Sequence, residues 1–179
     1  MSIVATREDG VRLAPLEVWH REEFAAHLDR AHDHIRGWVG DGFLTTTEPG
    51  ARATLQHYAD DAARDGRRLF GVWDDGRLVG GVMFVHFDAV QGVAELGCWS
   101  EPAGEGRGLI GWASRQLIDW AFDVRGLARL EWRCRSDNVR SAALAQRLGM
   151  RLEGVLRSAW LNDGARHDKQ VWALLADER

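Results

Sequence analysis

Cysteine, proline and tyrosine are scarce in this chain of 179 residues, which contains two, three and one of them, respectively. Two cysteines, Cys98 and Cys134, are too few for a disulfide framework, and we interpret both as small buried hydrophobic residues rather than as nucleophiles or metal ligands. The seven histidines are scattered, without an H-x-x-x-H pair or a Cys/His cluster. We therefore expect no metal site.

Long apolar runs are also missing. No segment reaches the length that crosses a membrane, and the N-terminus does not resemble a secretory signal, so we expect a cytoplasmic protein without a membrane partner. The net charge of −4 gives no support for nucleic-acid binding. With 45% hydrophobic and 28% charged residues, the composition is typical of a globular protein, and the length predicts one domain over residues 1–179.

The spacing of apolar and turn-forming residues predicts a mixed α/β fold. Two hairpins are expected, one turning at Asp74-Asp75-Gly76 and one at Asn162-Asp163-Gly164, because Asp-Gly favours tight turns between strands. A helix that starts at Asn138 is expected to end at Gly149, a typical C-terminal cap. The predicted elements are strand 11–15, helices 17–36 and 51–65, strands 69–73, 77–87 and 92–99, helix 108–124, strand 128–134, helix 138–148, and strands 151–160 and 167–175.

The most informative segment is Glu105-Gly106-Arg107-Gly108-Leu109-Ile110, which joins a predicted strand to a predicted helix. A glycine loop at this position lets backbone N–H groups face outward, and the helix N-terminus adds unpaired donors and the positive end of its dipole. Arg107 adds a formal positive charge. The segment is therefore predicted to bind a phosphate-bearing cofactor.

Two other phosphate-binding loops do not fit this segment. The pattern G-x-x-x-x-G-K-[ST] is absent because the chain has no Gly-Lys pair. A dinucleotide-binding G-x-G-x-x-G would need a differently spaced third glycine and a place in the first strand–helix–strand unit. The loop lies past the middle of this chain, so both nucleotide interpretations are excluded.

Several further motifs follow in a definite order: Glu95-Leu96-Gly97-Cys98-Trp99, then the glycine loop, then Arg133-Cys134-Arg135-Ser136-Asp137-Asn138-Val139-Arg140-Ser141, then Arg147-Leu148-Gly149-Met150 and Glu153-Gly154. In this order and spacing they resemble the GNAT superfamily of N-acyltransferases. Within it they resemble the ribosomal-protein N-terminal acetyltransferase (RimL/RimJ-like) branch. The resemblance covers nearly the whole chain, and the loop alone would be a weak signal.

The resemblance implies a central, mostly antiparallel twisted sheet of about seven strands flanked by about four helices. Its fourth and fifth strands should splay apart between residues 94–99 and 128–134, so that the pantetheine arm of acetyl-CoA lies in the gap. The cofactor contacts implied in this way are Cys98, Trp99, Glu105, Gly106, Arg107, Gly108, Leu109, Ile110, Asn138 and Ser141.

Acyl transfer to an amine requires a base for the amine proton and an acid for the leaving thiolate. The resemblance makes Glu95 the candidate base, directly or through water; the alternative is a strand carboxylate that pairs with a cation. A tyrosine often protonates the thiolate in this superfamily, but the corresponding position is Ala145, and Tyr58 lies far away in sequence. The branch implies Ser141 instead, whose hydroxyl can donate to sulfur, although a serine in the first turn of a helix can also serve only as a cap.

Glu105 departs from the family pattern, which has Gln or Arg at this position. A carboxylate beside a pyrophosphate is electrostatically unfavourable, so this departure raises a question about the loop. Together with the missing tyrosine, it keeps open the alternative of an inactive acyl-CoA-binding regulatory domain. The branch favours a protein N-terminal amine as acceptor, with a small-molecule amine or another acyl donor such as succinyl-CoA as alternatives. Nine tryptophans suggest large apolar contacts, so a homodimer is a further hypothesis.

Overall fold

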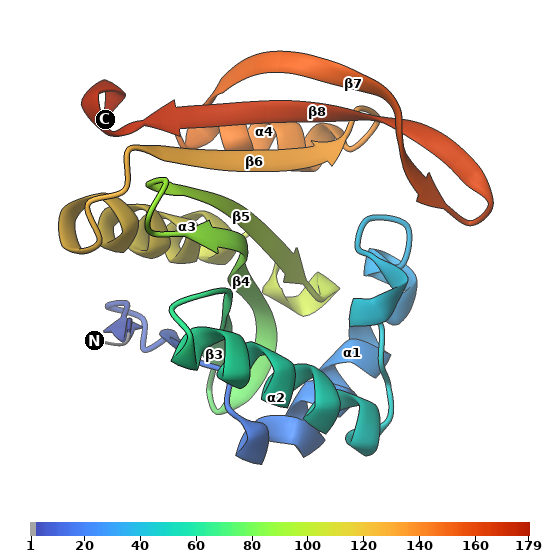
Figure 1. The fold of residues 1–179 in the computed structure, drawn as a ribbon. Helices are drawn as coiled ribbons and strands as arrows, with labels where there is room; N and C mark the ends of the chain where they lie inside the picture. The colour runs from blue at the N-terminus through green and yellow to red at the C-terminus, as the bar shows by residue number, and fades with distance from the viewer. Residues whose placement is uncertain (1–2) are drawn as a thin grey trace.

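Eight strands form a single sheet in the order β1-β2-β3-β4-β5-β6-β8-β7 in the computed structural model, which describes residues 3–179 (Figure 1). All neighbouring strands are antiparallel except β5 and β6, which are parallel. The strands are β1 (Ala5–Thr6), β2 (Arg12–Pro15), β3 (Arg68–Asp74), β4 (Arg77–Asp88), β5 (Val93–Ser100), β6 (Arg129–Arg135), β7 (Arg151–Asn162) and β8 (Ala165–Leu175).

The α-helices pack against both faces of the sheet and form two separate hydrophobic cores with it. Successive strand residues point to opposite faces, so β3 sends Phe70 and Val72 into one core and Leu69 into the other. Helix α3 (Leu109–Asp119) packs in the first core, whereas α1 (Arg21–Ile35) and α2 (Glu48–Ala63) form the second. Helix α4 (Val139–Arg147) packs against β6 (Figure 1). No helix within residues 3–179 is long and apolar enough to cross a membrane.

The predicted order of helices and strands is confirmed, with small differences at the ends. The two-residue β1 was not predicted, because so short a segment carries no alternation signal. Both predicted Asp-Gly turns form, and Asp75, Gly76, Asp163 and Gly164 all have positive φ, as this hairpin turn requires. Helix α3 ends earlier than predicted, and its last part, Trp120–Val124, continues as a π-helical turn.

The end of β5 is held to α1 by a buried polar network. The Trp99 indole N–H donates to His27 Nε2 at 2.8 Å, and both side chains are buried. Glu101, 1% exposed, accepts from Arg30 Nε at 2.8 Å and lies 3.3 Å from His27 Nδ1 and 2.9 Å from an Arg77 nitrogen. Although burial opposes ionisation, Arg30 and its neighbours hold the pKa of Glu101 below its ordinary value. Burial lowers the pKa of His27, which matches a neutral ring that accepts from Trp99.

Replacing Glu101 with Gln should lower the free energy of unfolding by about 1.5–3 kcal/mol, because hydrogen bonds to an ionised group contribute about that much. Since the pKa of Glu101 is lowered on folding, this stabilisation is present above its unfolded-state pKa and is lost as the pH falls through the folded-state value. Urea denaturation at pH 7 and in acid measures both effects. In the matched control Glu48→Gln, which breaks an exposed pair with Arg21, the change should stay below about 1 kcal/mol. Equal changes in the two variants would contradict the assignment.

Candidate active site

The parallel strands β5 and β6 pair over only four residues. Their register joins Val93 to Arg129 and ends at Leu96, which lies opposite Trp132. Beyond this point Gly97–Ser100 still pair with β4, and Arg133–Arg135 still pair with β8. The two strands therefore diverge, as Figure 1 shows, and the facing edges of both are left without a strand partner.

A cleft of about 1140 Å³ lies where the strands diverge. It runs from the glycine loop before α3, past the unpaired edges of β5 and β6, to the connection between α1 and α2 and to the β7–β8 hairpin. The side chains of Glu95, Cys98, Cys134 and Ser141 all line it. The cleft thus collects residues from segments that are far apart in sequence.

The loop before α3 presents backbone donors to this cleft. Gly106 and Gly108 have φ of 74° and 70°, which favour glycine, and a Cβ at either position would meet no atom within 4 Å. Helix α3 begins at Leu109 with Gly108 as its N-cap, and no side chain caps it. The N–H groups of residues 106–111 donate to no acceptor within residues 3–179. Open space and free N–H groups at a helix N-terminus are what an anionic ligand requires.

The two charged residues of the loop have different surroundings. The Arg107 side chain points away from the cleft and pairs with Asp74 and Asp9. Its positive charge therefore does not add to the anion site that the loop's N–H groups form. Glu105 faces the cleft and pairs with His34 at the end of α1, at 2.6 Å, and with Arg140 in the first turn of α4. Arg140, which the sequence reasoning did not assign, is therefore a cation that faces the cleft beside the loop.

Glu95 lies on β5 next to the last residue that pairs with β6. Its carboxylate is 17% exposed and 3.6 Å from the Arg133 guanidinium. Burial raises the pKa of Glu95 above its ordinary value, and the charges of Arg133 and Lys169 oppose that shift only in part. A carboxyl group with a raised pKa that faces a cleft is suited to accepting a proton.

Ser141 and Asn138 are linked to each other and to β6. The Asn138 side chain caps α4 by accepting from the Ser141 N–H at 3.1 Å. The Ser141 Oγ accepts from the indole N–H of the buried Trp132 at 2.9 Å. Trp132 is also the residue opposite Leu96, where the β5–β6 pairing ends. Glu95 on β5 and Ser141 on α4 thus both line the cleft, and Ser141 is tied to β6 through Trp132.

The other predicted cofactor contacts lie in or beside the cleft, with different degrees of burial. Burial raises the pKa of the Cys98 thiol to about 12, and it also raises that of Cys134. These shifts match small buried residues rather than reactive thiols. Trp99 is buried against Phe24 and Phe43 and lines the cleft from its position in the second core. Leu109 is part of the first core, and the half-buried Ile110 packs against it.

The far end of the cleft is lined by aromatic and cationic side chains. Trp38 and Phe43, from the α1–α2 connection, and Trp160, from β7, line it. The Arg135 guanidinium lies over Trp38 and Trp160, with 4.8 and 5.7 Å to the ring centroids, and donates to the Gly37 carbonyl at 2.9 Å. The sequence motifs single out none of these contacts.

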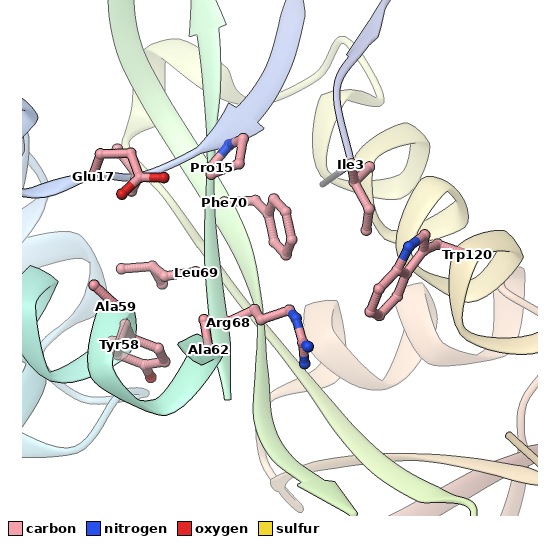
Figure 2. A pocket seen from close by; sticks show the side chains of 11 residues that line it. Ile3, Pro15, Glu17, Tyr58, Ala59, Ala62, Arg68, Leu69, Phe70 and Trp120 are labelled. Carbon is pink, nitrogen blue, oxygen red and sulfur yellow. The ribbon is translucent and has the colours of Figure 1, made fainter. Parts of the chain in front are cut away.

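A second hollow of about 300 Å³ lies away from this cleft, between α2, β3 and Trp120 (Figure 2). Its cation, Arg68, stacks on Phe87 and Trp120, with centroid distances of 4.6 and 5.1 Å, and donates to Asp65 and to the Gly66 carbonyl. The hollow therefore contains a guanidinium whose charge is already paired. Nothing in it resembles the set of donors at the glycine loop.

Comparison with known proteins agrees with this geometry. The family model described as "Acetyltransferase (GNAT) domain" matches residues 11–151. The chain belongs to the GNAT acetyltransferase family. The resemblance seen in its motifs is thereby confirmed, and the protein is an N-acetyltransferase.

Individual relatives refine the picture. The ribosomal-protein-serine acetyltransferase of Escherichia coli (strain K12) is 29% identical over 133 residues, which are 74% of each chain. YdaF of Bacillus subtilis (strain 168) is 30% identical over 171 residues, which are 96% of this chain and 88% of YdaF. Among solved structures, RimL, a ribosomal L7/L12 alpha-N-protein acetyltransferase in complex with coenzyme A, has a TM-score of 0.91 at 18% identity. The match covers 99% of this chain and 100% of RimL. That last likeness shows the fold of this GNAT chain.

Removing the Ser141 hydroxyl should expose the structural part of its role. In Ser141→Ala the buried Trp132 N–H loses its acceptor, which costs about 1–3 kcal/mol of unfolding free energy. Trp132→Phe removes that donor, so the double variant Trp132→Phe/Ser141→Ala should be more stable than the sum of the single effects predicts. Urea denaturation of the four proteins measures the coupling. Strictly additive changes would show that this hydrogen bond contributes nothing to stability.

Proposed function

We propose that this GNAT protein transfers the acetyl group of acetyl-CoA directly to a primary amine, and that the amine is a protein N-terminus. The observation that carries the proposal is the junction at which β5 and β6 part. Glu95 stands on one strand beside that point, and Ser141 is hydrogen-bonded to Trp132 on the other. The cleft leads from there to the free N–H groups of the glycine loop.

The residues present fit an acyl-CoA. The N–H groups of residues 106–111 would hold the pyrophosphate. The unpaired backbone edge of Gly97–Ser100 would form hydrogen bonds with the pantetheine amides. The side-chain oxygen of Asn138 accepts the hydrogen bond that caps α4, so its amide NH₂ group remains free to contact the pantetheine arm. Bound acetyl-CoA would supply an acyl group activated as a thioester. The coenzyme A in the solved RimL structure supports this assignment.

Glu95 acts as the base in this proposal. Its raised pKa lets the carboxylate accept a proton from the ammonium form of the acceptor, directly or through water, so that the amine can attack the thioester carbonyl. Arg133 lies 3.6 Å away, and its charge favours the ionised carboxylate. The proton thus passes from the acceptor nitrogen to an oxygen of Glu95.

Ser141 supplies the proton that the leaving sulfur needs. Its Oγ accepts from Trp132, so its own hydrogen remains available for donation into the cleft. When the C–S bond breaks, the hydroxyl proton neutralises the thiolate, and solvent returns a proton to the serine. Ser141 thereby takes the place of the tyrosine that much of the superfamily uses.

The choice of acceptor is supported by the relatives' names, which specify ribosomal-protein amines for the E. coli enzyme and for RimL. The far end of the cleft, between the α1–α2 connection and the β7–β8 hairpin, leaves room for an extended chain terminus beside Trp38 and Trp160. A small-molecule amine as acceptor and a different acyl donor are the alternative outcomes of the experiment below.

Release of free CoA from acetyl-CoA, measured with a panel of N-terminal peptides and small amines, tests the proposal. Turnover is expected with peptides that have a free N-terminus and not with their N-terminally blocked forms. Turnover with small amines alone would reassign the acceptor, and a faster reaction with succinyl-CoA would reassign the donor. CoA binding without turnover of any peptide or amine would refute the proposed classes of acceptor.

Replacing Glu95 with Gln should reduce kcat by about 100-fold, a typical contribution of a general base. The wild-type rate should rise with pH through the raised pKa of Glu95, and the variant should lose that rise. Since a raised pKa means that the ionised carboxylate costs folding free energy at neutral pH, the variant should be at least as stable as wild type. The control Glu153→Gln, which breaks an exposed pair with Arg129, should keep the wild-type pH profile. An unchanged kcat in Glu95→Gln would refute the assignment.

A further inference from the structure

The Glu105 carboxylate occupies the place in the cleft where a negative charge is least expected. It stands at the entrance of the loop whose free N–H groups attract an anion, and its side chain is 27% exposed. Burial alone would raise its pKa, but hydrogen bonds from Arg140 and His34 hold the pKa of Glu105 below its ordinary value. Glu105 is therefore ionised at neutral pH and is itself an anion beside the anion site.

The partners of Glu105 come from opposite sides of the cleft. His34 belongs to the last turn of α1, and Arg140 belongs to the first turn of α4. Glu105 lies between them, on the connection from β5 to α3, and all three side chains line the cleft. These two contacts of Glu105 thus link α1 and α4 across the cleft beside the phosphate-binding loop.

Arg140 is well placed to exchange partners. Its side chain is 62% exposed, so the guanidinium can move without disturbing the core. Arg107 is engaged with Asp74 and Asp9 outside the cleft. The pyrophosphate that approaches the loop would meet an arginine already held by a carboxylate, and it can offer that arginine a more highly charged bidentate partner.

We propose that Glu105 acts as an internal substitute for the cofactor phosphate: it holds Arg140 in the empty cleft and yields it to the pyrophosphate of the incoming acyl-CoA. Arg140 is then a phosphate ligand, and Glu105 is a positioning residue that weakens cofactor binding and speeds the release of CoA. This inference rests on the proposed acyl-CoA-dependent function. It explains why a residue that disfavours phosphate can stand in a phosphate-binding loop.

Isothermal titration of the purified protein with CoA and with pantetheine, which lacks the phosphates, tests the exchange. Glu105→Gln should bind CoA about tenfold more tightly, and Arg140→Gln about tenfold more weakly, because each change alters a charge-assisted contact. Both variants should bind pantetheine as wild type does. In the Arg140→Gln background, the gain from Glu105→Gln should shrink, since no arginine is left to be released. Stopped-flow release of CoA should be slower in Glu105→Gln.

Two matched controls, Glu48→Gln and Arg151→Gln, break exposed ion pairs outside the cleft and should bind CoA as wild type does. Unchanged or weaker CoA binding by Glu105→Gln would overturn the inference while leaving the proposed function intact. If Glu105→Gln tightens CoA binding equally with and without Arg140→Gln, Glu105 acts only by repelling the phosphates. That result would also overturn the proposed exchange. Absence of CoA binding by the wild-type protein would instead refute the proposed function. If Glu105→Gln fails to fold, the exposed Arg140→Gln still decides whether that arginine binds phosphate.

Discussion

The site depends on a hydrogen-bonded ladder that stops early. A parallel pair such as β5 and β6 satisfies the backbone groups of both strands only while they stay side by side. Here the pairing ends at Leu96 and Trp132, so the facing backbone groups beyond that point are available to a ligand. Were the ladder to continue through Cys98, the sheet would be complete and the cleft would be lost.

Strands that lose a neighbour must be held by something else, and each divergent end has its own side-chain network. The end of β5 is fixed to α1 through Trp99, His27 and Glu101. The end of β6 is fixed through Arg135, which reaches the Gly37 carbonyl and lies over Trp38 and Trp160. These side-chain contacts anchor the two strand ends in addition to their pairing with β4 and β8, while the backbone groups that face the gap stay free.

Local signals predicted the elements and the loop, because each depends on neighbours in the chain. Asp75-Gly76 and Asp163-Gly164 define their turns through their own φ angles, and Gly106 and Gly108 do the same for the loop. The direction of long charged side chains was not predictable in this way. Arg107 turns to Asp74, 33 residues away, while Glu105 reaches His34, 71 residues away. Such pairings depend on which helices the fold brings to the cleft, and no spacing in the sequence encodes that.

The hydrogen bonds of Ser141 support its proposed role as a proton donor over the alternative of a helix cap. A serine that only capped α4 would direct its oxygen to a backbone N–H of the first turn, but Asn138 already performs that function for Ser141 itself. The Ser141 oxygen instead accepts from Trp132, which uses one lone pair and leaves the hydroxyl hydrogen able to donate. That proton has the cleft and the Cys134 thiol as its surroundings. The half-buried Ser141 hydroxyl thus accepts from Trp132 and still has a hydrogen to donate, which is the property that the proposed protonation of the leaving thiolate requires.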